Sequence, residues 1–141
     1  MLPVFFLFSV ALTAQKHIYD IELFGKKIGQ TIVERTDKGD GEVQFKLTSS
    51  SDVNILFTHK TSVMNFDIVY KNGKLFTSYC KGVKDDVTEV VTLTLQGTHY
   101  LMKRGEEVLQ LNQLLDFSAI QLYFIEPVGR TKVFSERIGE F

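Results

Sequence analysis

Apolar and polar side chains alternate along most of the chain, and a period of two is typical of half-buried β-strands. The segment Glu42 to Asp52 shows it most clearly, because Val43, Phe45 and Leu47 point to one side and polar residues point to the other. Further strands are predicted at 19–23, 28–36, 60–70, 74–83, 87–95 and 98–102. This spacing predicts a mainly all-β fold: a curved antiparallel sheet, a sandwich or a partly open barrel.

Turn signals separate these strands. Asn72-Gly73 is the strongest, since a two-residue hairpin turn needs the positive φ angles that Asn and Gly adopt easily. Asp37 to Gly41, Asp85-Asp86 and Arg104-Gly105 predict further turns. Ile55-Leu-Phe57 interrupts the alternation, and we interpret it as a bend or a β-bulge.

One segment near the C-terminus breaks the β pattern. Ser118 and Gln121 have the spacing of a capping box, which predicts a short helix over 119–125, near the C-terminus. Pro127 would end that helix, because the residue before a proline is pushed out of the helical region. A further strand is the alternative for these residues, and Lys132 to Ser135 also reads as a strand.

The chain opens with an apolar run from Leu2 to Leu12. It is shorter than the roughly 20 residues that a membrane span needs, and it matches the apolar core of a signal peptide. Small Thr13 and Ala14 precede polar Gln15, so we expect residues 1–14 to be a signal peptide that is cleaved after Ala14. A buried first strand is the alternative. Residues 15–141 would then form a single antiparallel β domain in the periplasm or outside the cell.

Composition narrows the range of functions. Hydrophobic residues make up 44% of the 141 residues and charged residues 23%, which is typical of a globular protein with a core. The formal net charge of −1 argues against a nucleic-acid partner. Cys80 is the single cysteine, so an intrachain disulfide is impossible and a buried packing role is predicted.

Candidate chemistry is sparse. His17, His59 and His99 do not have the spacing of metal ligands, so neither a metal site nor a cofactor is predicted. No acid, base and nucleophile can be grouped from the sequence, so no catalytic residue is predicted. Glu126 lies between two apolar residues with Arg130 and Arg137 nearby in the sequence, which predicts a partly buried ion pair or, alternatively, an acid that contacts a ligand.

Several motifs taken together resemble a known family. They are Tyr19-Asp-Ile-Glu-Leu with Lys27-Ile-Gly, Asp52-Val-Asn-Ile-Leu-Phe, Tyr70-Lys-Asn-Gly-Lys-Leu, Phe117-Ser with Leu122-Tyr-Phe-Ile-Glu-Pro, and Val133-Phe-Ser-Glu. The set resembles an uncharacterised family of exported bacterial proteins that is catalogued as a domain of unknown function. The resemblance implies an envelope location and a curved antiparallel sheet, and it brings no catalytic residues. It also implies further strands after the Ser-Glu motif, so we expect the domain to be truncated at its C-terminus.

Three function classes follow, in order of preference. The first is a non-catalytic protein that binds a lipid or another apolar ligand on the curved sheet, with Met64 and Phe66 as speculative ligand-binding residues. In the alternative, these two residues simply belong to the core, together with Phe45, Leu47 and Leu93. The second class is an interaction or structural module of the cell envelope, which would bind another envelope protein. A hydrolase ranks last, and the mature chain is expected to have no transmembrane segment.

Overall fold

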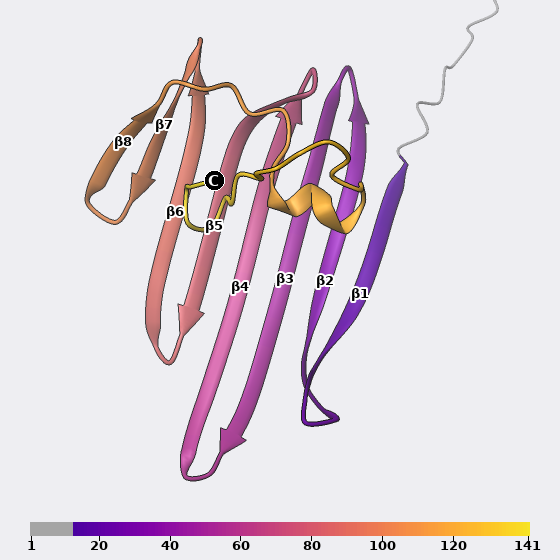
Figure 1. Cartoon of the computed structure of the whole chain (residues 1–141), viewed down its shortest axis with the longest axis vertical. Helices are drawn as coiled ribbons and strands as arrows, with labels where there is room; N and C mark the ends of the chain where they lie inside the picture. Colours follow the sequence, from indigo (N-terminus) through magenta and orange to yellow (C-terminus); the bar gives the residue numbers. More distant parts are fainter. Residues whose placement is uncertain (1–12) are drawn as a thin grey trace, which may run out of the picture.

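The computed structural model describes residues 13–141, and its strands form one open antiparallel sheet (Figure 1). Each strand pairs with the next one along the chain, in the order β1 to β8. The strands are β1 (Ala14–Leu23), β2 (Lys26–Gly39), β3 (Glu42–Ile55), β4 (Thr58–Lys71), β5 (Lys74–Lys84), β6 (Val87–Gln96), β7 (His99–Arg104) and β8 (Glu107–Leu111). The predicted all-β class is confirmed. The sequence did not distinguish a curved sheet from a sandwich or a partly open barrel. The described residues form one open sheet and not a two-sheet sandwich.

Tight turns join the strands. Asn72 and Gly73 both have positive φ, 49° and 74°, which confirms the predicted hairpin turn. The prediction of a bend or bulge at 55–57 was wrong, because Leu56 and Phe57 form the turn between β3 and β4. Fourteen consecutive residue pairs, from Glu42 with Lys71 to Ile55 with Thr58, align these two strands. This long register places the turn at Leu56, although leucine is not a residue that favours positive φ.

The first strand begins earlier than its sequence pattern predicted. Ala14 pairs with Thr36, and the carbonyl oxygen of Thr13 accepts a hydrogen bond of 3.0 Å from the N–H of Asp37. Ala14 therefore belongs to the sheet and Thr13 is hydrogen-bonded to it, although both lie before the predicted cleavage point. The apolar run of the predicted signal peptide falls within residues 1–12, which lie outside the described residues. Within residues 13–141, no helix is long and apolar enough to cross a membrane.

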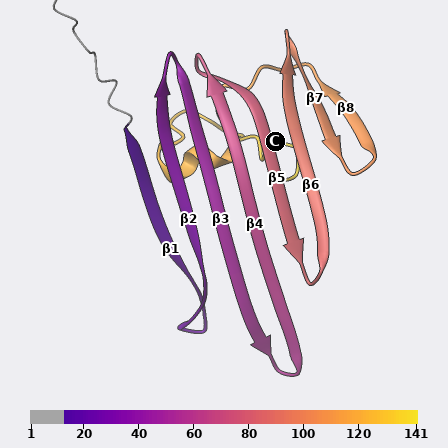
Figure 2. The same ribbon diagram turned by 180° about the vertical axis from the view of Figure 1, so that it is seen from behind.

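Residues 112–141, here called the C-terminal segment, cross one face of the sheet (Figures 1 and 2). The predicted helix is present only as a 3₁₀ helix, η1 (Ala119–Tyr123), which ends two residues before the predicted end. The side-chain Oε1 of Gln121 accepts a hydrogen bond of 3.0 Å from the N–H of Ser118, as the capping-box spacing predicted.

The predicted strand at 132–135 was wrong. Phe134 and Ser135 make only isolated bridges, to Ser118 and Glu140. No strand forms at 132–135 because of the position of the C-terminal segment. At residues 132–135 it lies across the face of the sheet, where strand side chains keep its backbone away from the strand backbones.

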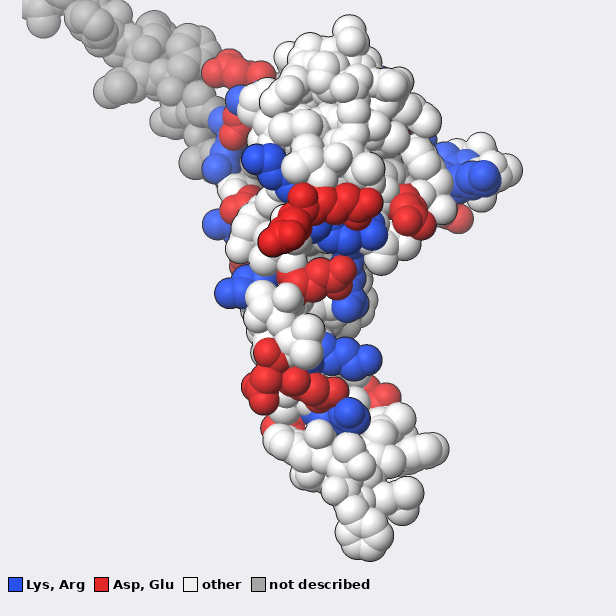
Figure 3. Space-filling view, turned by 90° about the vertical axis from the view of Figure 1, so that its left-hand side faces the viewer, with Lys and Arg blue, Asp and Glu red and all other residues white. Residues whose placement is uncertain are grey.

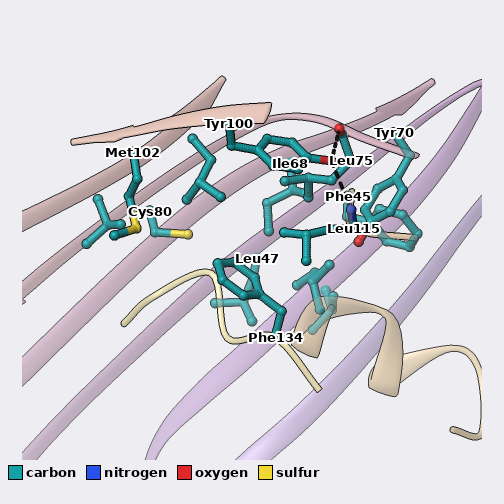
Figure 4. Packing of buried hydrophobic residues seen from close by; sticks show 14 residues of the cluster. Phe45, Leu47, Ile68, Tyr70, Leu75, Cys80, Tyr100, Met102, Leu115 and Phe134 are labelled. Atoms are coloured by element: carbon teal, nitrogen blue, oxygen red, sulfur yellow. Dashed lines mark hydrogen bonds between the residues drawn. The ribbon is translucent and has the colours of Figure 1, made fainter. Parts of the chain in front are cut away.

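The hydrophobic core lies between the sheet and the C-terminal segment (Figure 4). Its sheet side includes Val33, Phe45, Leu47, Ile68, Leu75, Cys80, Val91, Leu93, Tyr100 and Met102, and its other side includes Leu115, Ile120 and Phe134. Every second residue of a strand points to this face, so the alternation seen in the sequence becomes the core. Each fully buried large side chain contributes about 1.5–3 kcal/mol to folding.

A tyrosine from the sheet holds the start of the C-terminal segment. The hydroxyl of Tyr100 donates a hydrogen bond of 2.8 Å to the carbonyl oxygen of Leu75 and accepts one of 3.2 Å from the N–H of Leu115 (Figure 4). The N–H of Leu75 donates a third bond, of 2.8 Å, to the carbonyl oxygen of Leu115. These bonds satisfy buried backbone groups and fix where the segment joins the sheet.

Candidate functional site

A hollow of about 420 Å³ opens between the sheet and the C-terminal segment. Leu47 of β3 and Met64 and Phe66 of β4 form its sheet wall. The opposite wall consists of Ala119, Ile120, Leu122, Tyr123, Ser135, Glu136 and Arg137. We call this space the β4 hollow. It brings the two speculative ligand-binding residues of the sequence analysis, Met64 and Phe66, into one cavity.

The strand register explains why Met64 and Phe66 face the hollow. Ile68, two residues further along β4 on the same face, is fully buried under the C-terminal segment, whereas Phe66 and Met64 are only partly buried. Met64 lies opposite Ser49 on one side and Gly82 on the other. These small neighbours leave space around the methionine, so the apolar face of the sheet is incompletely filled here.

Two charged side chains define the polar part of the hollow. Arg137 is exposed, and its Nη1 lies 3.4 Å from the sulfur of Met64. Glu136 is only 1% exposed. Its Oε1 accepts hydrogen bonds from the hydroxyl of Ser118 and, at 3.2 Å, from the N–H of Ile120. Burial raises the pKa of the Glu136 carboxyl above its usual value, since a charge in this environment loses its hydration.

The contacts of Glu136 form a buried polar cluster. The hydroxyl of Ser118 also lies 2.5 Å from that of Tyr70, whose pKa is raised by burial. A serine beside a carboxyl and a tyrosine resembles a catalytic nucleophile with the neighbouring groups that activate it. However, Ser118 is 0% exposed and Tyr70 is 3% exposed, and neither lines the hollow, so a substrate cannot reach the serine oxygen. The cluster ties η1 and the end of the chain to β4, so its role is to anchor the C-terminal segment.

Comparison with known proteins identifies the family of this chain. A family model described as "Domain of unknown function (DUF6134)" matches residues 19–141. The chain belongs to the DUF6134 family. The matched range covers the second half of β1, every later strand, the C-terminal segment and both walls of the β4 hollow. A search of curated proteins and a search of solved structures found no match.

Membership in DUF6134 confirms the resemblance to a domain of unknown function. It assigns neither an activity nor a ligand. The function of this DUF6134 chain is therefore inferred from the side chains that the structure brings together.

The prediction of a partly buried ion pair at Glu126 was wrong. Its side chain is exposed, and Arg130 pairs instead with Asp116 at 3.2 Å, while it also lies over the ring of Phe117. Glu136 is the buried carboxyl of this DUF6134 chain, and the sequence analysis did not single it out. No local pattern marks Glu136 as buried, because residues 132–135 do not form a strand and the burial comes from the way the C-terminal segment folds onto the sheet.

The three histidines lie apart in the fold. The rings of His17 and Phe124 pack in a T-shaped arrangement with their centroids 4.9 Å apart. Nε2 of His59 lies 2.7 Å from Oδ1 of Asp52 across the β3–β4 hairpin. The His59–Asp52 pair was not expected from the sequence, because the two residues are seven positions apart and meet only through the hairpin register. Within residues 13–141, no three potential metal-ligating side chains are grouped closely enough to hold an ion.

Cys80 is buried, as the sequence analysis predicted. It lies opposite Phe66 on one side and Val91 on the other. Burial raises the pKa of its thiol to about 12, so the reactive thiolate is scarce at neutral pH. A packing role follows from this environment.

Proposed function

We propose that this DUF6134 chain is an exported, non-catalytic protein that binds an acyl chain with an anionic head in the β4 hollow. The observation that carries the proposal is the incomplete burial of Met64 and Phe66 on the apolar face of the sheet. A volume of about 420 Å³ lies within the range of roughly 300–1,000 Å³ that is usual for small-molecule sites. An apolar chain placed there would bury side-chain surface that the fold leaves open to water.

The exposed guanidinium of Arg137 supports an anionic head group. Within residues 13–141, Arg137 contacts the sulfur of Met64 and forms no ion pair. A guanidinium recognises carboxylate or phosphate through paired hydrogen bonds. A fatty acid or a phospholipid would each combine such a head with an acyl chain.

Fluorescence titration with a dansyl-labelled fatty acid tests the proposal. Met64→Ser removes apolar surface from the wall of the hollow, and we expect it to weaken binding roughly tenfold. Val63→Ser is the matched control, because Val63 is the neighbouring residue of β4 and points to the opposite face. The control should bind like the wild type. Equal effects of the two substitutions, or no saturable binding by the wild type, would contradict the proposal.

Phe66 separates a ligand site from a core residue. If Phe66 mainly lines the hollow, Phe66→Ser should lower affinity strongly and the free energy of unfolding only modestly. A pure core role would instead cost about 3–5 kcal/mol of stability on truncation of the ring and leave any binding by the folded protein unchanged. Urea unfolding and probe titration on the same variant distinguish these outcomes.

The head-group part of the proposal has its own test. Arg137→Gln should weaken binding of the dansyl fatty acid but leave binding of the corresponding uncharged dansyl alcohol unchanged, since only the acid pairs with the guanidinium. An equal loss for both probes would show that Arg137 does not recognise the head group.

Export is the part of the proposal that rests on residues 1–14. Mass spectrometry of the secreted protein should find its N-terminus at or near Gln15. A secreted mature protein that retains Leu2 to Leu12 would contradict cleavage at this site.

A further inference from the structure

Two hairpin turns at the same end of the sheet carry exposed apolar side chains. The β1–β2 turn presents Phe24, which is 93% exposed, and the β3–β4 turn presents Leu56, which is 91% exposed, and Phe57, which is fully exposed. Figures 1 and 2 both show these turns at the lower end of the sheet, away from the C-terminal segment. Residues 23–25 and 53–58 contain no charged side chain.

The two turns adjoin one another. A hollow of about 480 Å³ is lined by residues of both, including Phe24 from the first hairpin and Ile55 and Leu56 from the second. Phe24, Ile55, Leu56 and Phe57 therefore form one apolar region, here called the tip surface. Figure 3 shows the lower end of the molecule without charge, below a band where acidic and basic side chains alternate.

Folding does not explain the tip surface. Side chains exposed to this degree bury almost no area in the fold, so they contribute almost nothing to its stability. Leu56 has a φ of 56°, which Asn or Gly would adopt at lower cost. A polar turn would therefore serve the hairpin better. A cluster of exposed apolar residues of this kind is typical of a surface that contacts a membrane or another protein.

We propose that the tip surface docks this protein onto a lipid bilayer, with Phe24, Leu56 and Phe57 inserted at the boundary between head groups and acyl chains. The shape of the tip surface favours a bilayer over a protein partner. Phe24 and Leu56 flank a hollow between the two turns, and Phe57 is fully exposed outside it. A protein partner would need a surface that matches this irregular shape, whereas fluid lipid closes around it. Insertion at the boundary keeps turn backbone groups within reach of water and head groups.

Basic and acidic side chains both lie directly behind the tip surface, Glu22 and Asp52 among them, and the basic ones are placed where they can meet lipid phosphates. Lys26 directly follows the first turn, with Lys27 beside it, and Lys60 lies three residues beyond Phe57. Lysine stems can lie along an apolar surface while the ammonium groups reach lipid phosphates. Lys27 and Lys60 form exposed ion pairs with Asp20 and Asp85, and such pairs are weak enough to exchange for phosphate.

This inference rests on observations separate from the β4 hollow. The hollow lies beneath the C-terminal segment, and none of its lining residues belongs to the tip surface. Fatty-acid binding and membrane docking can therefore succeed or fail independently.

A fluorescent reporter next to the tip surface tests the inference in the full chain. Thr58→Cys places an exposed thiol beside Phe57, and labelling with an NBD group reports the polarity around it. The buried Cys80 should take up little label in the native protein. Vesicles of equimolar phosphatidylcholine and phosphatidylglycerol should shift the emission to the blue and raise its intensity several-fold. The same label at Thr98→Cys, in the turn between β6 and β7 at the opposite end of the sheet (Figure 1), is the positional control and should not respond.

Substitution then tests whether the apolar side chains cause the response. Leu56→Ser with Phe57→Ser should reduce vesicle partitioning of the Thr58→Cys reporter by tenfold to a hundredfold, on the order of what two partly buried side chains contribute. Val108→Ser with Val128→Ser removes exposed apolar surface elsewhere and should leave the partitioning unchanged. Circular dichroism and urea unfolding confirm that each variant is folded.

Three outcomes would overturn the inference. The Thr58→Cys reporter could remain insensitive to vesicles, which would place the tip surface outside the bilayer even if another part of the chain binds lipid. Its response could persist in the Leu56→Ser, Phe57→Ser variant. Alternatively, the reporter could respond to protein concentration without vesicles, with a dimer seen by sedimentation, and the tip surface would then bind a second copy.

Discussion

Replacement of Tyr100 by phenylalanine tests how the C-terminal segment is held on the sheet. The substitution removes one oxygen and keeps the buried ring, so packing changes little. The lost hydroxyl donates to the carbonyl oxygen of Leu75 and accepts from the N–H of Leu115, at 2.8 Å and 3.2 Å. Both partners are backbone groups of buried residues.

The magnitude follows from those two groups. A buried polar group that loses its partner costs about 1–3 kcal/mol, whereas the net contribution of a satisfied hydrogen bond is smaller. The loss affects one donor and one acceptor, so we expect Tyr100→Phe to lower the free energy of unfolding by about 2–4 kcal/mol. This is a large share of the 5–15 kcal/mol that is usual for a domain.

Urea unfolding measures the change, and Tyr79→Phe supplies the control. Tyr79 lies on β5 and is exposed, so removal of its hydroxyl should change stability by less than about 0.5 kcal/mol. Hydrogen exchange adds a local readout, because the amide of Leu115 should lose protection only in Tyr100→Phe. If Tyr100→Phe were as stable as Tyr79→Phe, the hydroxyl would not hold the C-terminal segment and the reasoning would be refuted.

Three further predictions concern stability and reactivity. Because the pKa of Glu136 is raised in the folded state, its contribution to stability is complete below its usual pKa and is lost as pH rises through the folded value. Urea unfolding between about pH 4 and pH 8 should show this fall in the wild type, and Glu136→Gln should flatten it. Cys80 should react with a thiol reagent only as fast as the protein opens, and fast modification of the native protein would contradict its packing role. Gly73→Val should cost about 1 kcal/mol or more in thermal melts, because φ is +74° at Gly73, whereas Gly82→Val has equally open surroundings without that φ and should cost less.

Local patterns were sufficient to predict the strands and most of their turns. The alternation in Glu42–Ile55 predicts which side chains point inward, and Phe45 and Leu47 are indeed buried. Asn72-Gly73 specifies its turn because its backbone preference is intrinsic to the two residues. Such properties depend on neighbours along the chain, so they can be read without knowledge of the fold.

The candidate site was predicted only in part. Met64 and Phe66 were correctly placed on the inner face, but the same pattern fits core residues such as Ile68 equally well. The difference between them is set by the C-terminal segment, which covers Ile68 and leaves Met64 partly open. Where that segment lies depends on long-range bonds such as those of Tyr100, and these join residues 15 and 25 positions apart.

By itself, the sequence determined an all-β chain, the inward faces of its strands and the hairpin at Asn72-Gly73. Tertiary structure alone decided that Leu56 and Phe57 form a turn, that Glu136 rather than Glu126 is the buried carboxyl, and that residues 132–135 make bridges instead of a strand. The physical reason is that backbone dihedral preference and side-chain alternation are local. Burial and partner choice depend instead on which distant segment covers a given face of the sheet.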